Sequence, residues 1–550
     1  MKIVLLALGG DAARAREALR ERYPQASIEI ISRGEFERAR MAARLRSARA
    51  RHAEVFAVST ERLSWQRGQN ALLLFGALAG ARRSIILDSH GAFREETRAQ
   101  ILLNAPGRLI REAALSGIAI ARAERELRRL ERAAGDGPST FARATKMTTK
   151  LAAPVDLDIV YLRATPGAGT QVGGASSHIN GFINAATQAG ARIRLISNDQ
   201  IAGLDETTTA LKIIGPEPVG ATRAAFDLRN NLLFTRRAAQ AVMEHAPPDF
   251  FYQRYSRFSW AGVEASLNTG RPLFLEYNGS EIWMGQHWDK SGMLALLERC
   301  ERLNLRAATR IFVVSEVDRR NLVREGVANE KIVVNPNGVD VERFRPGAGG
   351  AQARRELGIA DDTMLAGFVG TFGPWHGALV LAKAITLIPA EARIRFLMIG
   401  SGAEREEAER IVSAGGAERR VIFTGAVAHE RVPALLDACD VLVSPHVPLV
   451  DGSEFFGSPT KLYEYMAMGK GIVASRLGQI ADALTDEETA LLVKPGDSRA
   501  LSEAIMRLSE SPELRERLGA AARREAVSRH TWRHNAERVL RAYRLLADDA

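Results

Sequence analysis

Short apolar runs alternate with charged or Ala-rich stretches along most of the chain. In residues 1–132, runs of the length of one β-strand are separated by longer stretches of helical character, and they lie at residues 3–8, 27–32, 55–60 and 84–89. Strands that alternate with helices are typical of a parallel sheet covered on both faces. We therefore predict a small parallel α/β domain in residues 1–132, which ends in a strongly charged helix over residues 120–132.

Two further series of the same kind follow. The strands of the first series are expected at residues 158–164, 193–197, 250–255, 271–277 and 311–315. Those of the second series are expected from Leu365 onward and at residues 394–400, 421–425, 441–445, 471–475 and 490–494. The pattern predicts two Rossmann-like domains, residues 155–345 and 346–528, which face each other across a cleft. Ligands of such open sheets bind at the carboxyl ends of the strands.

The remaining segments have different patterns. Residues 133–154 lack periodicity and contain Gly, Pro, Ser and Thr, which is typical of a linker. In residues 529–550, apolar side chains recur at spacings of three and four, at Trp532, Ala536, Val539, Tyr543 and Leu546. This spacing predicts one apolar helix face that packs back on the body of the protein.

Composition narrows the possible classes. The 550 residues are 46% hydrophobic and 25% charged, as in ordinary globular proteins. The two cysteines, Cys300 and Cys439, stand far apart without metal-ligand spacing, so we expect neither disulfides nor a zinc site. No apolar run is long enough to span a membrane, and the chain lacks a nucleophile elbow, a Walker lysine loop and an HExxH motif. We expect a cytoplasmic location, and no bound metal or cofactor.

The most informative stretch is DGSEFFGSPTKLYEYMAMGKGIVAS, residues 451–475. Ser458 is a good N-cap and Pro459 suits the first position of a helix. The free amides, the helix dipole, the Thr460 hydroxyl and the Lys461 ammonium would together attract phosphate. Glu464, one turn further on, can accept hydrogen bonds from the two hydroxyls of a ribose.

This string resembles the donor-site motif of the family 4 retaining glycosyltransferases of the GT-B fold. The resemblance covers about residues 155–550 and includes VVSEVDRRNLVREGV (313–327), NPNGVD (335–340), GFVGTFGPWHG (367–377) and LMIGSGAE (397–404) followed by VIFTG. It implies two facing Rossmann-like domains and transfer of a sugar from a nucleotide-sugar donor to an acceptor hydroxyl. The implied setting is the assembly of polysaccharides or glycoconjugates, with a glycan or lipid-linked acceptor.

The resemblance also implies roles for single residues in the donor site. Glu464 should bind the ribose, the loop from Gly370 to Gly377 should face the diphosphate, and the nucleobase should rest near Ala426 and Val427. The full set of expected donor contacts is Gly173, Gly174, Thr371, Gly373, Ala426, Val427, Ser458, Thr460, Lys461 and Glu464.

The sequence departs from the family pattern at two places. The first glutamate of the family's glutamate pair is replaced by Phe456, and Glu454 is the nearest carboxylate that could substitute. The basic pair expected in the diphosphate loop is replaced by Thr371 and His376. A diphosphate would raise the pKa of His376 and so favour its charged form.

In the first Rossmann-like domain, Gly173 and Gly174 open a loop where backbone can approach a ligand. His178 follows at a helix start and is either a helix-capping residue or a residue that faces the cleft near the donor and acceptor. Candidate acceptor or sugar contacts follow two buried strands, and each could equally be a turn residue. They are Tyr252, Arg254, Asn278, Ser280 and Glu281.

Two functional hypotheses remain open. In a retaining glycosyltransferase, Lys461, His376, His178 and Glu454 are the candidate catalytic residues; an inverting rival would use His178 as the base. In a non-catalytic member of the fold, the same site would only bind nucleotide-sugars or serve as a scaffold.

Positive charge is concentrated near the start of the chain. Residues 1–150 contain 28 Lys and Arg against 16 Asp and Glu, whereas the remainder is nearly balanced. Six apolar residues can share one helix face flanked by arginines: Leu109, Ile110, Ala113, Ala114, Ile118 and Ala121. The pattern favours either docking on an anionic membrane, at the inner face of the plasma membrane, or packing on the N-terminal sheet. We expect no nucleic-acid partner.

Overall fold

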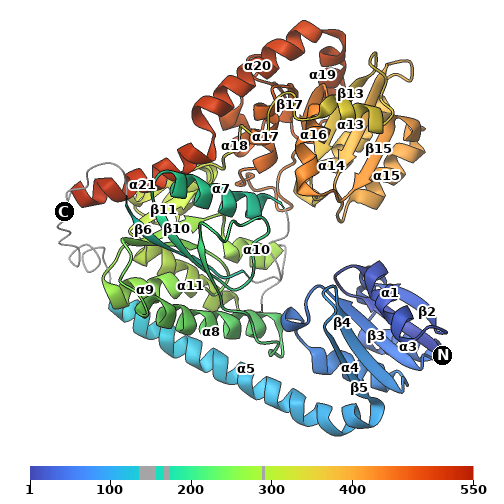
Figure 1. Cartoon of the computed structure of the whole chain (residues 1–550), viewed down its shortest axis with the longest axis vertical. Coiled ribbons are helices and arrows are strands. Elements are labelled where there is room, and N and C mark those ends of the chain that lie inside the picture. Colours follow the sequence, from blue (N-terminus) through green and yellow to red (C-terminus); the bar gives the residue numbers. More distant parts are fainter. Residues whose placement is uncertain (136–155, 166–172, 288–291, 549–550) are drawn as a thin grey trace.

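Three β-sheets organise the protein in the computed structural model, which describes residues 1–135, 156–165, 173–287 and 292–548. The predicted linker, residues 133–154, lies almost wholly outside the described residues, as does the loop 166–172 that leads to Gly173. Figure 1 shows the three sheets in three separate units, each with its own flanking helices, and the long helix α5 along the lower edge of the molecule. None of the helices in the described ranges combines the length and apolar character that crossing a membrane requires.

The N-terminal sheet has five strands in the order β2-β1-β3-β4-β5. Its first four strands match the four predicted strands and are parallel, as expected; the fifth, β5, was not predicted and pairs antiparallel with β4 at the edge of the sheet. The sequence of β5, FREET, contains too few apolar residues for the pattern to predict a strand. The elements are β1 (Lys2–Ala7), α1 (Ala12–Arg22), β2 (Ser27–Ser32), α2 (Arg33–Arg38), α3 (Met41–Ala50), β3 (Val55–Thr60), α4 (Gln69–Leu78), β4 (Arg83–Asp88) and β5 (Phe93–Thr97).

Helix α5 (Arg98–Ala134) joins the N-terminal unit to the rest of the protein (Figure 1). It starts with a capping box between Thr97 and Gln100. Its first turns pack on the N-terminal sheet through Ile101 and Ala105. Its last turns lie in the core of the second unit, which is built around the sheet of strands β6 to β12. The buried residues there are Ala119, Ala123, Leu127, Leu130 and Ala134. The helix is therefore one continuous element, and the predicted domain end at residue 132 falls inside the core of the second unit.

The burial of α5 on one side leaves a second apolar face open. Leu103, Ile110 and Ile118 are 81%, 71% and 62% exposed, and Ala113, Ala114 and Ala121 are exposed beside them. Of the predicted face, Leu109 alone is half-buried. Packing and docking were predicted as alternatives, but the helix has a packed face and a separate open one.

The second sheet has seven parallel strands in the order β12-β11-β10-β9-β6-β7-β8. The short strands β8 and β12 were not among the predicted ones. The elements are β6 (Asp158–Arg163), α7 (Gly174–Gln188), β7 (Arg192–Ser197), β8 (Ala210–Ile213), α8 (Arg223–Met243), β9 (Phe250–Arg254), α9 (Ala261–Thr269), β10 (Leu273–Tyr277), α10 (Glu281–His287), α11 (Leu294–Ala307), β11 (Arg310–Val313), α12 (Glu316–Arg324) and β12 (Ile332–Val334).

The third sheet has six parallel strands in the order β15-β14-β13-β16-β17-β18. Its order reverses beside β13, the switch point where open α/β sheets bind ligands. The elements are α13 (Gly350–Glu356), β13 (Met364–Val369), α14 (Ala378–Leu387), β14 (Ile394–Ile399), α15 (Arg405–Ala414), β15 (Val421–Gly425), α16 (Val432–Asp437), β16 (Val441–Ser444), α17 (Thr460–Met468), β17 (Gly471–Ser475), α18 (Gly478–Ala483), β18 (Leu491–Val493), α19 (Ser498–Glu510), α20 (Pro512–Arg529) and α21 (Trp532–Asp548). Single 3-10 turns (Leu63–Trp65, Asn329–Lys331, Pro374–His376, Glu418–Arg420 and His429–Arg431) complete the described elements.

The last two helices return the chain to the second sheet (Figure 1). α20 packs on α17 and β17 of the third sheet, and α21 then crosses over to pack on α7. The apolar face of α21, from Trp532 to Tyr543, is buried in the same cluster as Tyr161, Phe182 and Phe250 of the second unit. The C-terminal helix, which follows the helices of the third sheet, is therefore buried in a core cluster of the second unit.

Candidate donor site and the facing acceptor side

Helix α17 begins at Thr460, where the first amides of a helix lack intrahelical acceptors. Pro459 is the N-cap and the residue before it makes no capping bond, so the prediction of Ser458 as N-cap is wrong by one residue. The Ser458 hydroxyl instead accepts a hydrogen bond from the Asn337 amide at 3.2 Å and lies 3.2 Å from the Tyr463 hydroxyl. Ser458 thus holds the start of α17 against the turn at Asn337.

Lys461 is a buried cation that makes neither a hydrogen bond nor an ion pair with the described residues. Its side chain is 7% exposed, and its Nζ has no hydrogen-bond partner among the described residues. The ammonium lies 4.7 Å from the ring centre of Phe368, and a Cβ placed on Gly370 would be 2.9 Å from it. Burial lowers the pKa of Lys461 to about 7, although Glu464 opposes that shift. An anion at this point would restore the charged form.

Two imidazoles lie beside Lys461. The rings of His376 and His446 are 5.5 Å apart, and a Cβ on Gly370 would be 3.1 Å from Nδ1 of His376. Burial, reinforced by the charge of Lys461, lowers the pKa of His376 to about 2 and that of His446 well below 6.5. In the free protein His376 is therefore uncharged at neutral pH, because it is desolvated beside the charge of Lys461; the expectation that a diphosphate favours its charged form stays a prediction.

His446 was not among the predicted site residues. It follows β16, its Nδ1 is 3.0 Å from the Ser444 hydroxyl, and its buried Nε2 has no hydrogen-bond partner among the described residues. The signal was present in the sequence VLVSPH, because a polar residue directly after a buried strand lies at the carboxyl edge of the sheet.

Glu464 lies one turn beyond Lys461 and is 8% exposed. Burial raises its pKa to about 7, while the charges of Arg343 and Lys461 act in the opposite direction. Arg343 was not among the predicted site residues, although it follows the NPNGVD turn closely. Its guanidinium donates a hydrogen bond to the carbonyl of His429 at 2.8 Å.

Two of the other predicted donor contacts, Gly174 and Thr371, touch residues of this cluster. Gly174 lies against Thr460, since a Cβ there would be 3.2 Å from the Thr460 hydroxyl, and this contact joins the two Rossmann-like units. The Thr371 hydroxyl is 3.4 Å from Nδ1 of His376. Beyond β15, Ala426 is exposed and Val427 is half-buried. Gly373 caps the 3-10 turn that carries His376, and Gly173 bonds to Ser176 at the start of α7.

Opposite this cluster, the ends of β6, β9 and β10 carry a network centred on Glu276, which sequence reasoning also missed. The Tyr161 hydroxyl donates to Glu276 at 2.5 Å, the Asn278 amide donates at 2.8 Å, and Arg254 forms an ion pair with the same carboxylate. Burial would raise the pKa of Glu276, but the charges of His178 and Arg254 and these hydrogen bonds outweigh burial and lower it.

Two predicted residues do not face the cleft. His178 is 3% exposed, with Nε2 3.4 Å from Glu276 and its ring 5.5 Å from that of Trp532. Burial lowers its pKa to about 4, so it is neutral above that pH and Arg254 is the lasting counter-ion of Glu276. Tyr252 is fully buried in the aromatic core beside Tyr161, which contradicts a role in sugar binding.

Ser280 and Glu281 help to build the wall behind this network. The Ser280 hydroxyl donates to Glu301 at 2.8 Å, and the amide of Glu281 donates to the other oxygen of that carboxylate at 2.9 Å. The side chain of Glu281 is buried and lies 3.5 Å from Arg257. Of these two predicted acceptor contacts, Ser280 lines an open cavity and Glu281 is part of the packed structure.

The segment from Asp451 to Phe456 reaches across to the second sheet. Glu454 accepts two hydrogen bonds from Arg320 at 3.0 and 2.8 Å, and Asp451 accepts one from the Trp283 indole at 2.7 Å. The ring of Phe456 packs edge-on to Trp283, with ring centres 5.6 Å apart. Glu454 is thus held by Arg320, away from Lys461, which contradicts its expected substitution for the missing glutamate. The described residues contain no group of three or more His, Cys, Asp or Glu side chains suited to a metal ion.

Comparisons with known proteins agree with this arrangement. The family model "Glycosyltransferase Family 4" matches residues 172–343, and "Glycosyl transferases group 1" matches residues 351–525. A D-inositol 3-phosphate glycosyltransferase from Stackebrandtia nassauensis is 32% identical over 224 residues, which are 39% of this chain and 48% of that protein. A phosphatidyl-myo-inositol mannosyltransferase from Mycobacterium leprae is 33% identical over 43% of this chain and 59% of its own length. The chain spans about half the length of the curated relatives it matches.

Solved structures share the fold. Sucrose-phosphate synthase from Thermosynechococcus elongatus has a TM-score of 0.59 at 22% identity and covers 72% of this chain and all of its own. HepE from Anabaena in complex with UDP has a TM-score of 0.55 at 19% identity and covers 70% of this chain and 99% of its own. Because the two family models match consecutive segments that together make up more than half of the chain, the protein belongs to the family 4 glycosyltransferases of the GT-B fold.

Proposed function

We propose that this chain transfers a sugar from a nucleoside-diphosphate sugar to an acceptor hydroxyl, with retention of the anomeric configuration. The observation that carries the proposal is Lys461, a buried ammonium with no anionic partner among the described residues, beside two uncharged imidazoles at the start of α17. A diphosphate supplies the charge that this site lacks. The UDP and UDP-glucose complexes of HepE, a protein of the same fold, support a nucleotide-sugar as the donor.

In the proposed reaction, the bond between the anomeric carbon and the diphosphate oxygen breaks, and the acceptor oxygen bonds to that carbon from the same face. The proton of the acceptor hydroxyl passes to the leaving diphosphate. Lys461 and the amides at the start of α17 stabilise the charge that develops on the diphosphate. Glu464 binds the ribose hydroxyls, and Thr460 and Thr371 contribute hydroxyl donors. An inverting route with His178 as base is disfavoured, because His178 is buried against Glu276.

Donor binding tests the proposal directly. Thermal melting with a panel that includes UDP-glucose and GDP-mannose should show stabilisation by at least one donor, because a ligand of the folded state raises stability by mass action. Glu464→Ala should lose about 1.5–3 kcal/mol of donor binding, the cost of a charge-assisted hydrogen bond. Unchanged donor affinity in a folded Glu464→Ala protein would contradict the assignment of the ribose site.

The competing hypothesis is a non-catalytic member that senses nucleotide-sugars, and Phe456 in place of a carboxylate is the observation that favours it. Release of free nucleoside diphosphate from the donor without acceptor separates the two hypotheses. A pure binding protein melts at a higher temperature with donor but releases no diphosphate.

The acceptor is proposed to be a glycan or lipid-linked molecule, and the open face of α5 supports docking at the inner face of an anionic membrane. Its exposed apolar residues are flanked by the exposed arginines Arg111, Arg125 and Arg128. Such a face buries its side chains among acyl chains while the arginines bind lipid phosphates. We propose polysaccharide or glycoconjugate assembly as the process served.

Vesicle co-sedimentation tests the docking. Full-length protein should pellet with phosphatidylglycerol vesicles at low salt and be released at high salt. Because the end of α5 belongs to the second core, deletion of residues 1–132 would disturb the enzyme itself. Ile110→Glu with Ile118→Glu is the sharper variant and should stay in the supernatant, whereas Met243→Glu, at a 70% exposed site on α8, should pellet like the wild type. Equal pelleting of all three proteins would exclude this face.

A further inference from the structure

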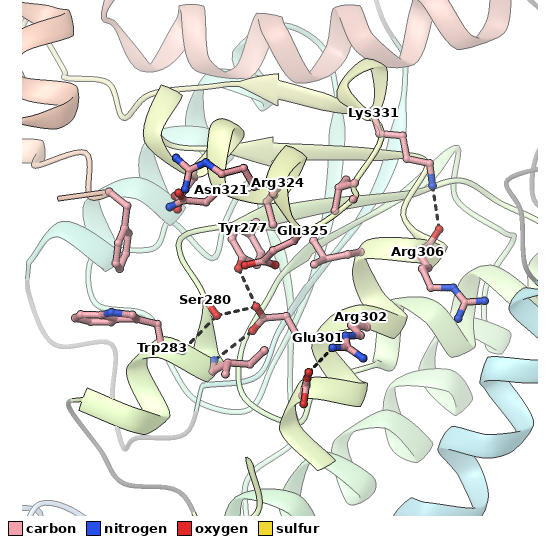
Figure 2. Close-up of a pocket in the computed structure, with 18 of the residues that line it drawn as sticks. Tyr277, Ser280, Trp283, Glu301, Arg302, Arg306, Asn321, Arg324, Glu325 and Lys331 are labelled. Atoms are coloured by element: carbon pink, nitrogen blue, oxygen red, sulfur yellow. Dashed lines mark hydrogen bonds and ion pairs between the residues drawn. The ribbon is translucent and has the colours of Figure 1, made fainter. Parts of the chain in front are cut away.

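A large cavity lies between the second sheet and the Asp451–Phe456 segment (Figure 2). Its volume is about 1110 Å³, and its walls come from the end of β10, from α11 and α12, and from Ser453, Glu454 and Phe456 of the other Rossmann-like unit. Ligand sites for drug-sized molecules measure roughly 300–1,000 Å³. The space is therefore sufficient for more than one sugar ring.

The lining combines aromatic rings with groups that bind hydroxyls. Trp283 and Phe456 form one edge, and the polar wall includes Glu301, Arg302, Asn321, Arg324, Glu325 and Lys331. Figure 2 shows Trp283 on one side of the cavity and Arg302 and Lys331 on the other. Apolar ring faces with converging donors and acceptors suit a saccharide, whereas a second nucleotide would place its diphosphate among several carboxyl groups.

Two buried carboxyl groups in this wall differ in their hydrogen bonding. Glu301 is saturated: it accepts from the Tyr277 hydroxyl at 2.9 Å, the Ser280 hydroxyl at 2.8 Å and the Glu281 amide at 2.9 Å. Asp318 is 3% exposed, and its Oδ2 has no hydrogen-bond partner among the described residues. A buried polar atom left unpaired in the free protein needs an explanation, and a ligand hydroxyl provides one.

Burial also favours the protonated form of Asp318. It raises the pKa of this carboxyl well above 3.8, and the neighbouring Glu301 adds to the shift. A protonated carboxyl can donate one hydrogen bond and accept another, as a sugar hydroxyl does.

We propose that this cavity binds an oligosaccharide portion of the acceptor, with Asp318 as a hydrogen-bonding residue and with Trp283 and Phe456 against the sugar rings. The inference rests on the proposed function and specifies the acceptor. One residue of the cavity wall, Phe456, is close in sequence to the candidate donor site, five residues before Lys461. An acceptor held there contacts residues of both Rossmann-like units.

Direct glycan binding tests the proposal without donor. Saturation-transfer NMR and titration with maltotriose, mannotriose and chitotriose should show binding of at least one trisaccharide to the wild type. Asp318→Leu, which keeps the branched shape of the side chain and removes a buried unpaired carboxyl, should fold and bind that trisaccharide at least tenfold more weakly. Arg319→Ala is the matched control on the same helix; Arg319 pairs with Glu316 and does not line the cavity, so binding should be unchanged.

Three outcomes would overturn the inference: no trisaccharide binds the wild type, Asp318→Leu binds as tightly as the wild type, or Arg319→Ala loses binding to the same extent. Melting temperatures show that each variant is folded. Glu464→Ala separates this inference from the donor assignment, because it should keep trisaccharide binding while losing donor binding. Failure of donor binding in the wild type, with trisaccharide binding intact, would count against the proposed function alone.

Discussion

The two facing sides of the candidate site each contain a buried charged group, but the two groups differ in whether they have partners. On the third sheet, Lys461 has no anionic partner among the described residues, and its pKa falls to about 7. On the second sheet, Glu276 is equally buried but is surrounded by Arg254, Tyr161 and Asn278, and its pKa is lowered from 4.5. The ammonium on the first side lacks a hydrogen-bond partner, whereas the carboxylate on the second side has several. The difference suggests that a charged ligand would bind on the side of Lys461, whereas the side of Glu276 would contribute to the shape of the site.

The largest expected effect comes from breaking the network on the Glu276 side. Glu276→Gln should destabilise the fold by about 3–5 kcal/mol, because it leaves Arg254 as an uncompensated buried charge. Chemical denaturation of the variant and the wild type measures the loss of free energy of unfolding. The stabilisation due to Glu276 is present above pH 4.5 and is lost as pH falls through its lowered pKa, so the two curves should converge in acid. A variant as stable as the wild type at pH 7 would show that this network does not support the fold.

The opposite substitution on the Lys461 side should separate stability from binding. Lys461→Met should raise the melting temperature at pH 7, because it removes the cost of burying an unpaired ammonium. The same variant should bind nucleoside diphosphate about tenfold to a hundredfold more weakly, since it loses a charge-assisted interaction of about 1.5–3 kcal/mol. Calorimetric titration with UDP and thermal melting provide the two measurements. A fall in both stability and affinity would contradict the view that Lys461 is held ready for an anion.

Donor affinity should depend on pH on both sides of neutrality. Above pH 7 the free protein loses the proton of Lys461, which the anion must restore, so affinity should fall by up to tenfold per pH unit. Below pH 7, protonation of Glu464 removes the carboxylate that accepts the ribose hydroxyls. The two groups titrate as a coupled pair, so the profile reports apparent pKa values. Lys461→Arg should flatten the alkaline limb and Glu464→Gln the acidic limb; a flat wild-type profile from pH 5 to 9 would exclude both assignments.

The smallest effect is expected at the ion pair that joins the two units. Glu454 and Arg320 are both about half exposed, and exposed pairs contribute about 0–1 kcal/mol. Glu454→Gln should therefore leave the melting temperature and the rate of diphosphate release from the donor nearly unchanged. A hundredfold loss of turnover would indicate that Glu454 is a catalytic residue after all. It would then require the segment from Asp451 to Phe456 to move during the reaction.

The sequence determined the parts of the protein that depend on local patterns. Apolar runs located most of the central strands of all three sheets, and Gly469 after an apolar helix marked the end of α17. The string from Ser458 to Glu464 predicted a donor site because its residues are neighbours in the chain. The short edge strands β5, β8 and β12 were missed, because strands that are partly exposed or only three to five residues long carry little periodic signal.

Only the tertiary structure decided which groups meet and how each is charged. His446 and Arg343 come from loops far from α17, and Glu276 gathers partners from three elements, so no local pattern could pair them. The neutral state of His376 follows from burial beside Lys461, although its position in the loop suggested a cation. The periodicity of α5 likewise could not show which apolar face is packed, because that face contacts the N-terminal sheet and the core around the second sheet, which come from distant segments of the chain. Burial and charge depend on contacts between distant segments, and those contacts exist only in the folded chain.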